Sequence, residues 1–206
     1  MTNFRLRALV LLGILGFSLV GLSQTTARSQ SNVTKRAAIG LNVKYDTERD
    51  ESIVSTPVTL VRETPGKIEA QFPEGIRNLP SERLYFSAFF SYAMRTYVAP
   101  DHVVFGLLSL SQGATIYDHD TEAVITIDGA DLKPGRLRVV DRRPNTGLQF
   151  QNLTFWHEEL ELPVSTQDFL RICSAKRVAI RLGKTRFDLK NAQLKSLREL
   201  AAEIRP

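Results

Sequence analysis

The feature that most limits the fold of this chain is a series of strand-length apolar runs, separated by turn residues, from Ile53 to Asn152. The segments ERLYFSAFFSYAM (82–94) and HVVFGLLSLS (102–111) are apolar at successive positions, which is typical of strands covered on two faces. VSTPVTLVR (54–62) is rich in β-branched residues, and Pro57 within it favours an edge position or a strand start. These runs predict a meander of antiparallel strands.

Two dipeptides predict turns within this meander. Asp128-Gly129 lies between extended runs and predicts a two-residue hairpin, because both central positions of such a turn need a positive φ. Pro134-Gly135 predicts a second turn, followed by another strand.

The C-terminal segment predicts a helix, a hairpin and a second helix. Ser165 is placed to cap a helix that starts at Thr166, and Asn191 to cap a final helix. Gly183-Lys184 fits a two-residue hairpin turn. The predicted fold is mainly β, an antiparallel sandwich-like or half-barrel domain with two short C-terminal helices flanking a β-hairpin.

The N-terminus predicts export. Arg5 and Arg7 precede a run of 15 residues from Ala8 to Leu22, and small residues follow, which is the pattern of a secretory signal peptide. The run is shorter than the roughly 20 residues that span a bilayer as a helix. We expect a signal peptide over 1–27, a flexible leader over 28–44 and one β-rich domain over 45–206. The expected location is periplasmic or extracellular, with no transmembrane anchor after cleavage.

Charge and cysteine content limit the partner classes. Removal of residues 1–27 leaves 25 of the 27 basic residues against 22 acidic ones, so the mature net charge is about +3. This mild excess favours solubility and gives no support to nucleic acid as a partner. The single cysteine, Cys173, cannot form an internal disulfide and is predicted to lie on a buried helix face. The partner is not identified, and a protein or a glycan stays open.

FWHEELELP (155–163) is the most suggestive run for chemistry. On a strand, His157, Glu159 and Glu161 share one face, about 6.5–7 Å apart along the row. A zinc-protease helix would need a histidine where Glu161 stands. We expect this row to be a solvated face, whereas Glu158, on the opposite face, predicts a bulge near His157 or a paired carboxylate.

Other chemical motifs are incomplete. YDHDTEA (117–123) begins like a calcium loop, but Ala123 and Gly129 stand where such a loop needs glycine and glutamate, which favours a polar loop. The sequence has no Gly-x-Ser-x-Gly elbow and no Gly-rich phosphate loop after a strand. We therefore expect no catalytic residue, no metal ligand set and no cofactor, and the sequence favours a non-catalytic protein.

Arginines are the candidate ligand-binding residues: Arg136, Arg138, Arg181 and Arg186. In the expected hairpin register Arg181 lies directly opposite Arg186, and like charges in this arrangement are unfavourable unless an acid or an anionic ligand lies between them. Asp188, diagonal to Arg181, is the internal candidate for that acid.

The segments ITIDG (125–129), EELELPVSTQDFLRICSAKRVAIRLGKTRFDL (158–189) and LKSLREL (194–200) carry a family resemblance. Over Tyr45–Ile204 the chain resembles an uncharacterised family of exported bacterial single-domain proteins. The resemblance implies fold and export, and no activity comes with it.

Three functions stay open at this point. The first is an exported, non-catalytic binding or envelope accessory module. The second is a metal-assisted hydrolase that uses His157 with Glu159 or Glu161. The third is binding of an anion or a glycan through the surface arginines.

Overall fold

The computed structural model describes residues 40–204, apart from 67, 73–74, 94–97 and 145–153. The predicted signal peptide and residues 28–39 of the predicted leader lie outside the described residues. The first strand, β1 (Asn42–Asp46), begins three residues before the expected domain start at Tyr45, and Leu41 before it is already buried.

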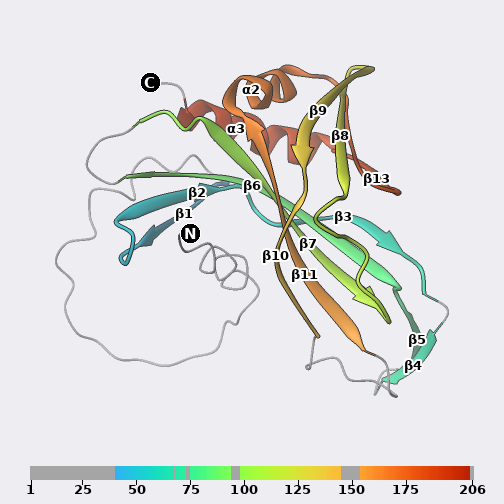
Figure 1. The fold of residues 1–206 in the computed structure, drawn as a ribbon. Coiled ribbons are helices and arrows are strands. Elements are labelled where there is room, and N and C mark those ends of the chain that lie inside the picture. Colours follow the sequence, from blue (N-terminus) through green and yellow to red (C-terminus); the bar gives the residue numbers. More distant parts are fainter. Residues whose placement is uncertain (1–39, 67, 73–74, 94–97, 145–153, 205–206) are drawn as a thin grey trace.

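A large antiparallel sheet is the main layer of the fold (Figure 1). Its strands follow the order β1-β2-β6-β7-β11-β10, and β3 pairs with β6 beside β2. Pro57 lies between β2 and β3, where a missing N–H breaks no ladder. The strands after β1 are β2 (Glu51–Ser55), β3 (Thr59–Thr64), β6 (Glu82–Ala93), β7 (His102–Gln112), β10 (Arg138–Pro144) and β11 (Phe155–Ser165).

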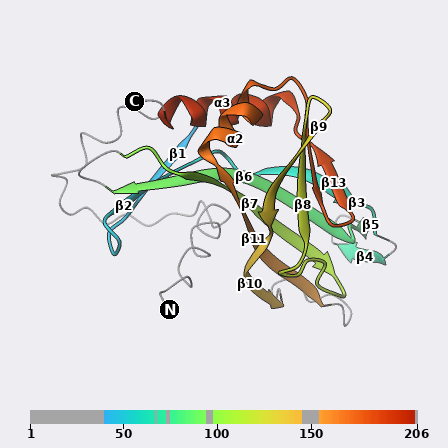
Figure 2. The same ribbon diagram turned by 45° about the horizontal axis from the view of Figure 1, so that its top comes forward.

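A second sheet and two helices form the other layer. The second sheet has the order β13-β12-β8-β9, and β4 with β5 makes a separate hairpin. Figure 2 shows the two helices side by side along one end of the molecule. The bounds are β4 (Ile68–Phe72), β5 (Gly75–Leu79), β8 (Glu122–Ile127), β9 (Ala130–Arg136), α2 (Thr166–Ser174), β12 (Val178–Leu182), β13 (Thr185–Asp188) and α3 (Asn191–Ile204).

The core lies between these layers and confirms the sandwich-like prediction. Alternate residues of the long strands point into it, and phenylalanines join the layers: the rings of Phe86 and Phe105 are 5.2 Å apart edge to face, and Phe86 lies 6.4 Å from Phe187 of β13. Phe105 in turn packs edge-on against Phe169 of α2. The inward residues of the large sheet include Leu84, Phe86, Ala88, Phe90, Val103, Phe105, Leu107, Leu160, Leu162 and Val164.

Two local predictions are confirmed. Asp128 and Gly129 both have positive φ (48° and 97°) in the β8–β9 turn. Ser165 caps α2, since its hydroxyl accepts the Asp168 N–H at 3.1 Å.

Two other local predictions are wrong. Pro134-Gly135 does not form a turn but lies within β9, an edge strand, close to a register shift against β8. Asn191 is the first residue of α3, not its cap, and the Lys190 N–H is accepted by Gln193 Oε1 at 2.8 Å. A proline is tolerated in β9 because an edge strand leaves some N–H groups unpaired.

Candidate functional site

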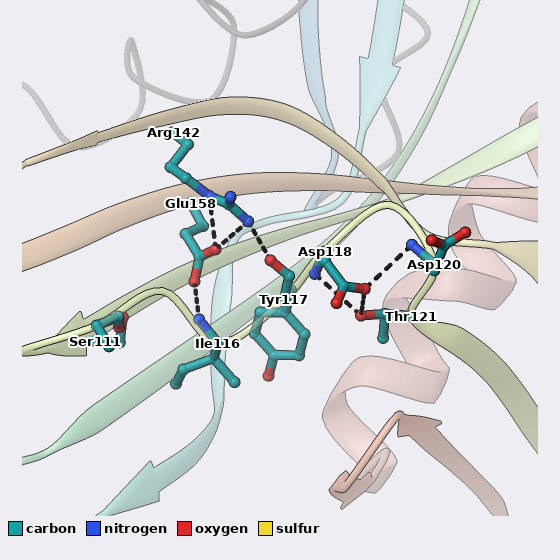
Figure 3. A network of polar contacts seen from close by, with 9 residues as sticks. Ser111, Ile116, Tyr117, Asp118, Asp120, Thr121, Arg142 and Glu158 are labelled. Carbon is teal, nitrogen blue, oxygen red and sulfur yellow. Dashed lines mark hydrogen bonds and ion pairs between the residues drawn. The ribbon is translucent and has the colours of Figure 1, made fainter.

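Glu158 in the FWHEELELP run is a paired carboxylate, which is one of the two predicted alternatives; the other is a bulge near His157. Its side chain is fully buried and accepts hydrogen bonds from Arg142 Nε at 3.2 Å and from the Ile116 N–H at 2.9 Å (Figure 3). The Arg142 Nη2–Glu158 Oε1 distance is 3.0 Å. The pairing of β11 with β7 is regular through His157, and the register shift lies in β10, between Val139 and Asp141.

A buried tyrosine extends this network. Arg142 also donates to the main-chain carbonyl of Tyr117, and the Tyr117 hydroxyl donates to Glu82 Oε1 at 3.0 Å. Burial raises the pKa of the Tyr117 phenol far above its usual value, so the hydroxyl stays protonated. The network holds the loop before β8 against the large sheet, and each group named here is bonded to another. Its geometry favours a structural role.

The loop that carries Tyr117 is the predicted polar loop. Asp118 Oδ1 accepts the Asp120 N–H at 3.1 Å and the Thr121 hydroxyl at 2.9 Å (Figure 3). Asp118 therefore closes its own turn in the way short acidic side chains commonly do.

The row His157, Glu159 and Glu161 lies on one face of β11, as predicted, but the expectation that it is solvated is wrong. Glu159 and Glu161 are 1% and 3% exposed. His157 Nε2 lies 3.0 Å from Glu159 Oε1, while Glu159 Oε2 is buried with no hydrogen-bond partner among the described residues. In the described part of the chain, no three His, Cys, Asp or Glu side chains are grouped to hold a metal ion.

Cys173 has the predicted buried position on α2. It is 6% exposed, and its thiol donates to the Leu197 carbonyl at a sulfur–oxygen distance of 3.4 Å. The position favours a packing role over a reactive one.

Arg136 and Arg138 line one groove, of about 530 Å³, which we call the β9 groove. Arg136 is ion-paired with Asp120 at 2.9 Å, and Arg138 lies opposite Glu161 in the strand register. The lining residues are His102, His119, Lys133, Pro134, Gly135, Arg136, Leu137, Arg138, Pro163, Ser165 and Asp168. Lys133 is also paired, with Glu122 at 3.1 Å. In the β9 groove, Arg136 and Lys133 therefore already have acidic partners.

Arg186 lines a second groove, of about 700 Å³, which we call the β12–β13 groove. Four of its lining side chains are cations and one is a carboxylate. The lining residues are Thr126, Gly129, Lys176, Arg177, Val178, Ala179, Arg186, Asp188, Leu189, Lys190 and Asn191. The structure thus divides the four predicted arginines between two places, with Arg181 beside the second groove and outside its lining.

The predicted pairing of Arg181 opposite Arg186 is confirmed. Arg181 Nη1 donates to the Gly183 carbonyl at 3.2 Å. Among the described residues, no ion pair joins Asp188 to either arginine, so the internal neutralisation suggested by the sequence is not observed. The two arginines are therefore directly opposed in the register, and neither forms an ion pair with an acid among the described residues.

Asp128 fixes the end of the β12–β13 groove. Its Oδ1 accepts the Arg177 N–H at 2.8 Å and the Lys176 N–H at 3.1 Å. These two hydrogen bonds lower the pKa of the Asp128 carboxyl, and the bond from the Arg177 N–H has the larger effect. Because the carboxylate accepts both N–H groups, it holds the main chain of Lys176 and Arg177 beside the β8–β9 turn.

Three cations of this groove, Lys176, Arg177 and Lys190, were not among the predicted ligand-binding residues. Lys190 could have been found, because it follows Arg186 and Asp188 in the same alternation. Lys176 has no such signal, since it precedes β12 and is placed by Asp128.

The fold and grooves define a β-sandwich-like protein with a basic surface site. No protein-family model matches the chain, and neither a curated protein nor a solved structure is significantly similar to it. No helix in the described part of the chain combines the length and apolar character needed to cross a bilayer.

Proposed function

We propose that this is an exported, non-catalytic binding protein whose ligand is an anion held at the β12–β13 groove. The observation that carries the proposal is the excess of cations in that groove: none of them forms an ion pair with an acid among the described residues, and the Asp128 carboxylate acts electrostatically on only two of them, Lys176 and Arg177. Lys176, Arg177, Arg186 and Lys190 line it with Asp188 as the one carboxylate, and Arg181 lies beside it.

The energetics of the hairpin support a ligand. Directly opposed like charges on neighbouring strands destabilise a sheet, and the Arg181–Arg186 pair has this arrangement. An anion between the two guanidinium groups replaces repulsion by two attractive contacts, and planar guanidinium groups suit carboxylate, sulfate or phosphate oxygens. Binding of an anion would therefore stabilise the hairpin.

The β9 groove supports the same function less well. Two of its cations, Arg136 and Lys133, are already paired with Asp120 and Glu122. A ligand there must compete with these acids.

The hydrolase alternative has less support in the geometry. His157 and Glu159 form a pair, but no third ligand side chain joins them within the described residues. Export is supported by the sequence of residues 1–27, which has the basic and apolar regions of a signal peptide.

Binding of fluorescein-labelled heparin, a model polyanion, tests the proposal. We expect binding at 50 mM NaCl that weakens strongly at 300 mM, because exposed charges are screened within about 6–14 Å over this range. Arg186→Ala is expected to weaken binding at least fivefold, and Arg138→Ala, a matched arginine in the β9 groove, much less.

Each other outcome contradicts a defined part of the proposal. Absent or salt-independent binding would remove anion binding as the function. A larger loss from Arg138→Ala than from Arg186→Ala would place the ligand in the β9 groove instead.

A further inference from the structure

Arg181, beside the β12–β13 groove, and three of the lining cations form two pairs along the hairpin. Arg181 lies opposite Arg186, and Ala179 lies opposite Asp188. The ladder continues one step further, because the Leu189 N–H donates to the Val178 carbonyl at 2.9 Å. Continued by one more residue, past the ends of both strands, this register would put Arg177 and Lys190 opposite each other, and both line the groove, so they form a second cation pair beyond the first.

The spacing of the two cation pairs suits a ligand with more than one anionic group. Arg181 lies in β12 and Arg177 directly before that strand, four residues away, and a strand rises about 3.3 Å per residue, so the Cα atoms of the two pairs lie about 13 Å apart. The oxygens of one sulfate or phosphate group bond donors at about 3 Å, so one group meets both pairs only if the long side chains converge on it, whereas a ligand with several anionic groups meets each pair separately. Between the pairs stand Ala179 and the carboxylate of Asp188, which favours an uncharged ligand segment there.

We infer that the ligand is a linear acidic polysaccharide that lies along β12 and β13, with anionic groups at both cation pairs. This inference rests on the proposed anion binding at the same groove and names the chemical class of the ligand. A chain of sugar units presents carboxylates or sulfates at intervals and uncharged hydroxyl groups between them.

The other lining residues fit a sugar chain. Asn191 offers an amide to sugar hydroxyls, and the Thr126 hydroxyl, which donates to Asp131 Oδ1 at 2.7 Å, can still accept from one. The described lining holds no aromatic side chain, and aromatic stacking is what single-stranded nucleic acids mainly use. Its larger apolar members, Val178 and Leu189, are buried (2% and 6% exposed), so neither presents a side chain for insertion into a lipid layer.

Size-defined oligogalacturonates, from the monomer to the dodecamer, test the inference by calorimetric titration of the full mature protein. We expect weak binding of the short oligomers and at least a tenfold gain once an oligomer spans both pairs, since the second contact is then intramolecular. The double variant Arg177→Ala/Lys190→Ala is expected to abolish this gain and to keep the weak binding of short oligomers.

Control ligands and a control variant separate the possible failures. Lys195→Ala removes an exposed lysine of α3 outside the groove and should leave the length dependence unchanged. Equal affinity for monomer and long oligomers would overturn the inference and leave anion binding standing. If the protein binds neither the oligomers nor heparin nor inorganic phosphate, both the polysaccharide inference and the proposed anion binding are overturned. Tighter binding of polyphosphate, single-stranded DNA or phosphatidylglycerol vesicles at equal ionic strength would overturn the polysaccharide assignment.

Discussion

Arg186→Glu is expected to make the protein more stable and to abolish anion binding. The substitution replaces a like-charge pair with an opposite-charge pair, because Arg181 lies directly opposite position 186. Cross-strand pairs of opposite charge contribute about 0.2–1 kcal/mol, and opposed like charges cost a similar amount. The exchange therefore raises the free energy of unfolding by about 1 kcal/mol at low salt, after allowance for solvent at this exposed position.

Thermal unfolding followed by circular dichroism measures this gain. For a domain of this size, about 1 kcal/mol corresponds to a rise of roughly 2–4 °C in Tm. The rise should shrink in 1 M NaCl, where the screening length is about 3 Å. Arg186→Gln removes the repulsion without adding an attraction and is expected to give a smaller rise.

Binding of labelled heparin by the same variants completes the test. A charge reversal at the groove should abolish binding, whereas Arg186→Gln should only weaken it. An unchanged or lower Tm at low salt, together with retained binding, would refute the reasoning. It would mean that the two arginines are separated and solvated, and that neither senses the other.

Three further predictions concern the scaffold. Arg142→Ala should lower the free energy of unfolding by about 3 kcal/mol in urea titrations, because loss of one partner leaves the buried Glu158 charge with only the Ile116 N–H; a cost below about 1 kcal/mol would contradict this. Tyr117 has a raised pKa, so stability should fall as pH rises above 10, and Tyr117→Phe should reduce this alkaline loss in unfolding measured between pH 8 and 11. Asp128 has a lowered pKa, so its contribution should be present above about pH 4 and lost as pH falls further; an NMR titration that gives Asp128 an ordinary pKa would contradict this.

Local features of the fold could be predicted from the sequence because each depends on a few adjacent residues. The Asp128-Gly129 turn needs only two residues that tolerate positive φ, and the Ser165 cap needs only the N–H of Asp168. The Gly183-Lys184 turn fixes the hairpin register, and with it the Arg181–Arg186 pair. These predictions are confirmed because tertiary packing does not compete with them.

Features that depend on distant partners could not be predicted in the same way. Glu158 is paired with Arg142, 16 residues away, and with Ile116, 42 residues away, and no sequence spacing indicates either contact. The burial of Glu159 likewise cannot be read from alternation, which gives the face of a strand but not what lies against it. The predicted turn at Pro134-Gly135 is wrong because an edge strand tolerates a proline, and the sequence does not show that β9 is an edge strand.

The pairing of charges separates the scaffold from the proposed site. Inside the sandwich, Glu158 and Glu82 each accept hydrogen bonds, since an unpaired buried charge costs several kcal/mol. At the hairpin surface, water lowers the cost of repulsion enough for Arg181 and Arg186 to face each other, but not to zero. An acid at either position would remove that cost. The Arg181–Arg186 pair retains this repulsion and lies beside the β12–β13 groove. Binding of an anionic ligand, as we propose, gives a reason for this arrangement that solvation alone does not give.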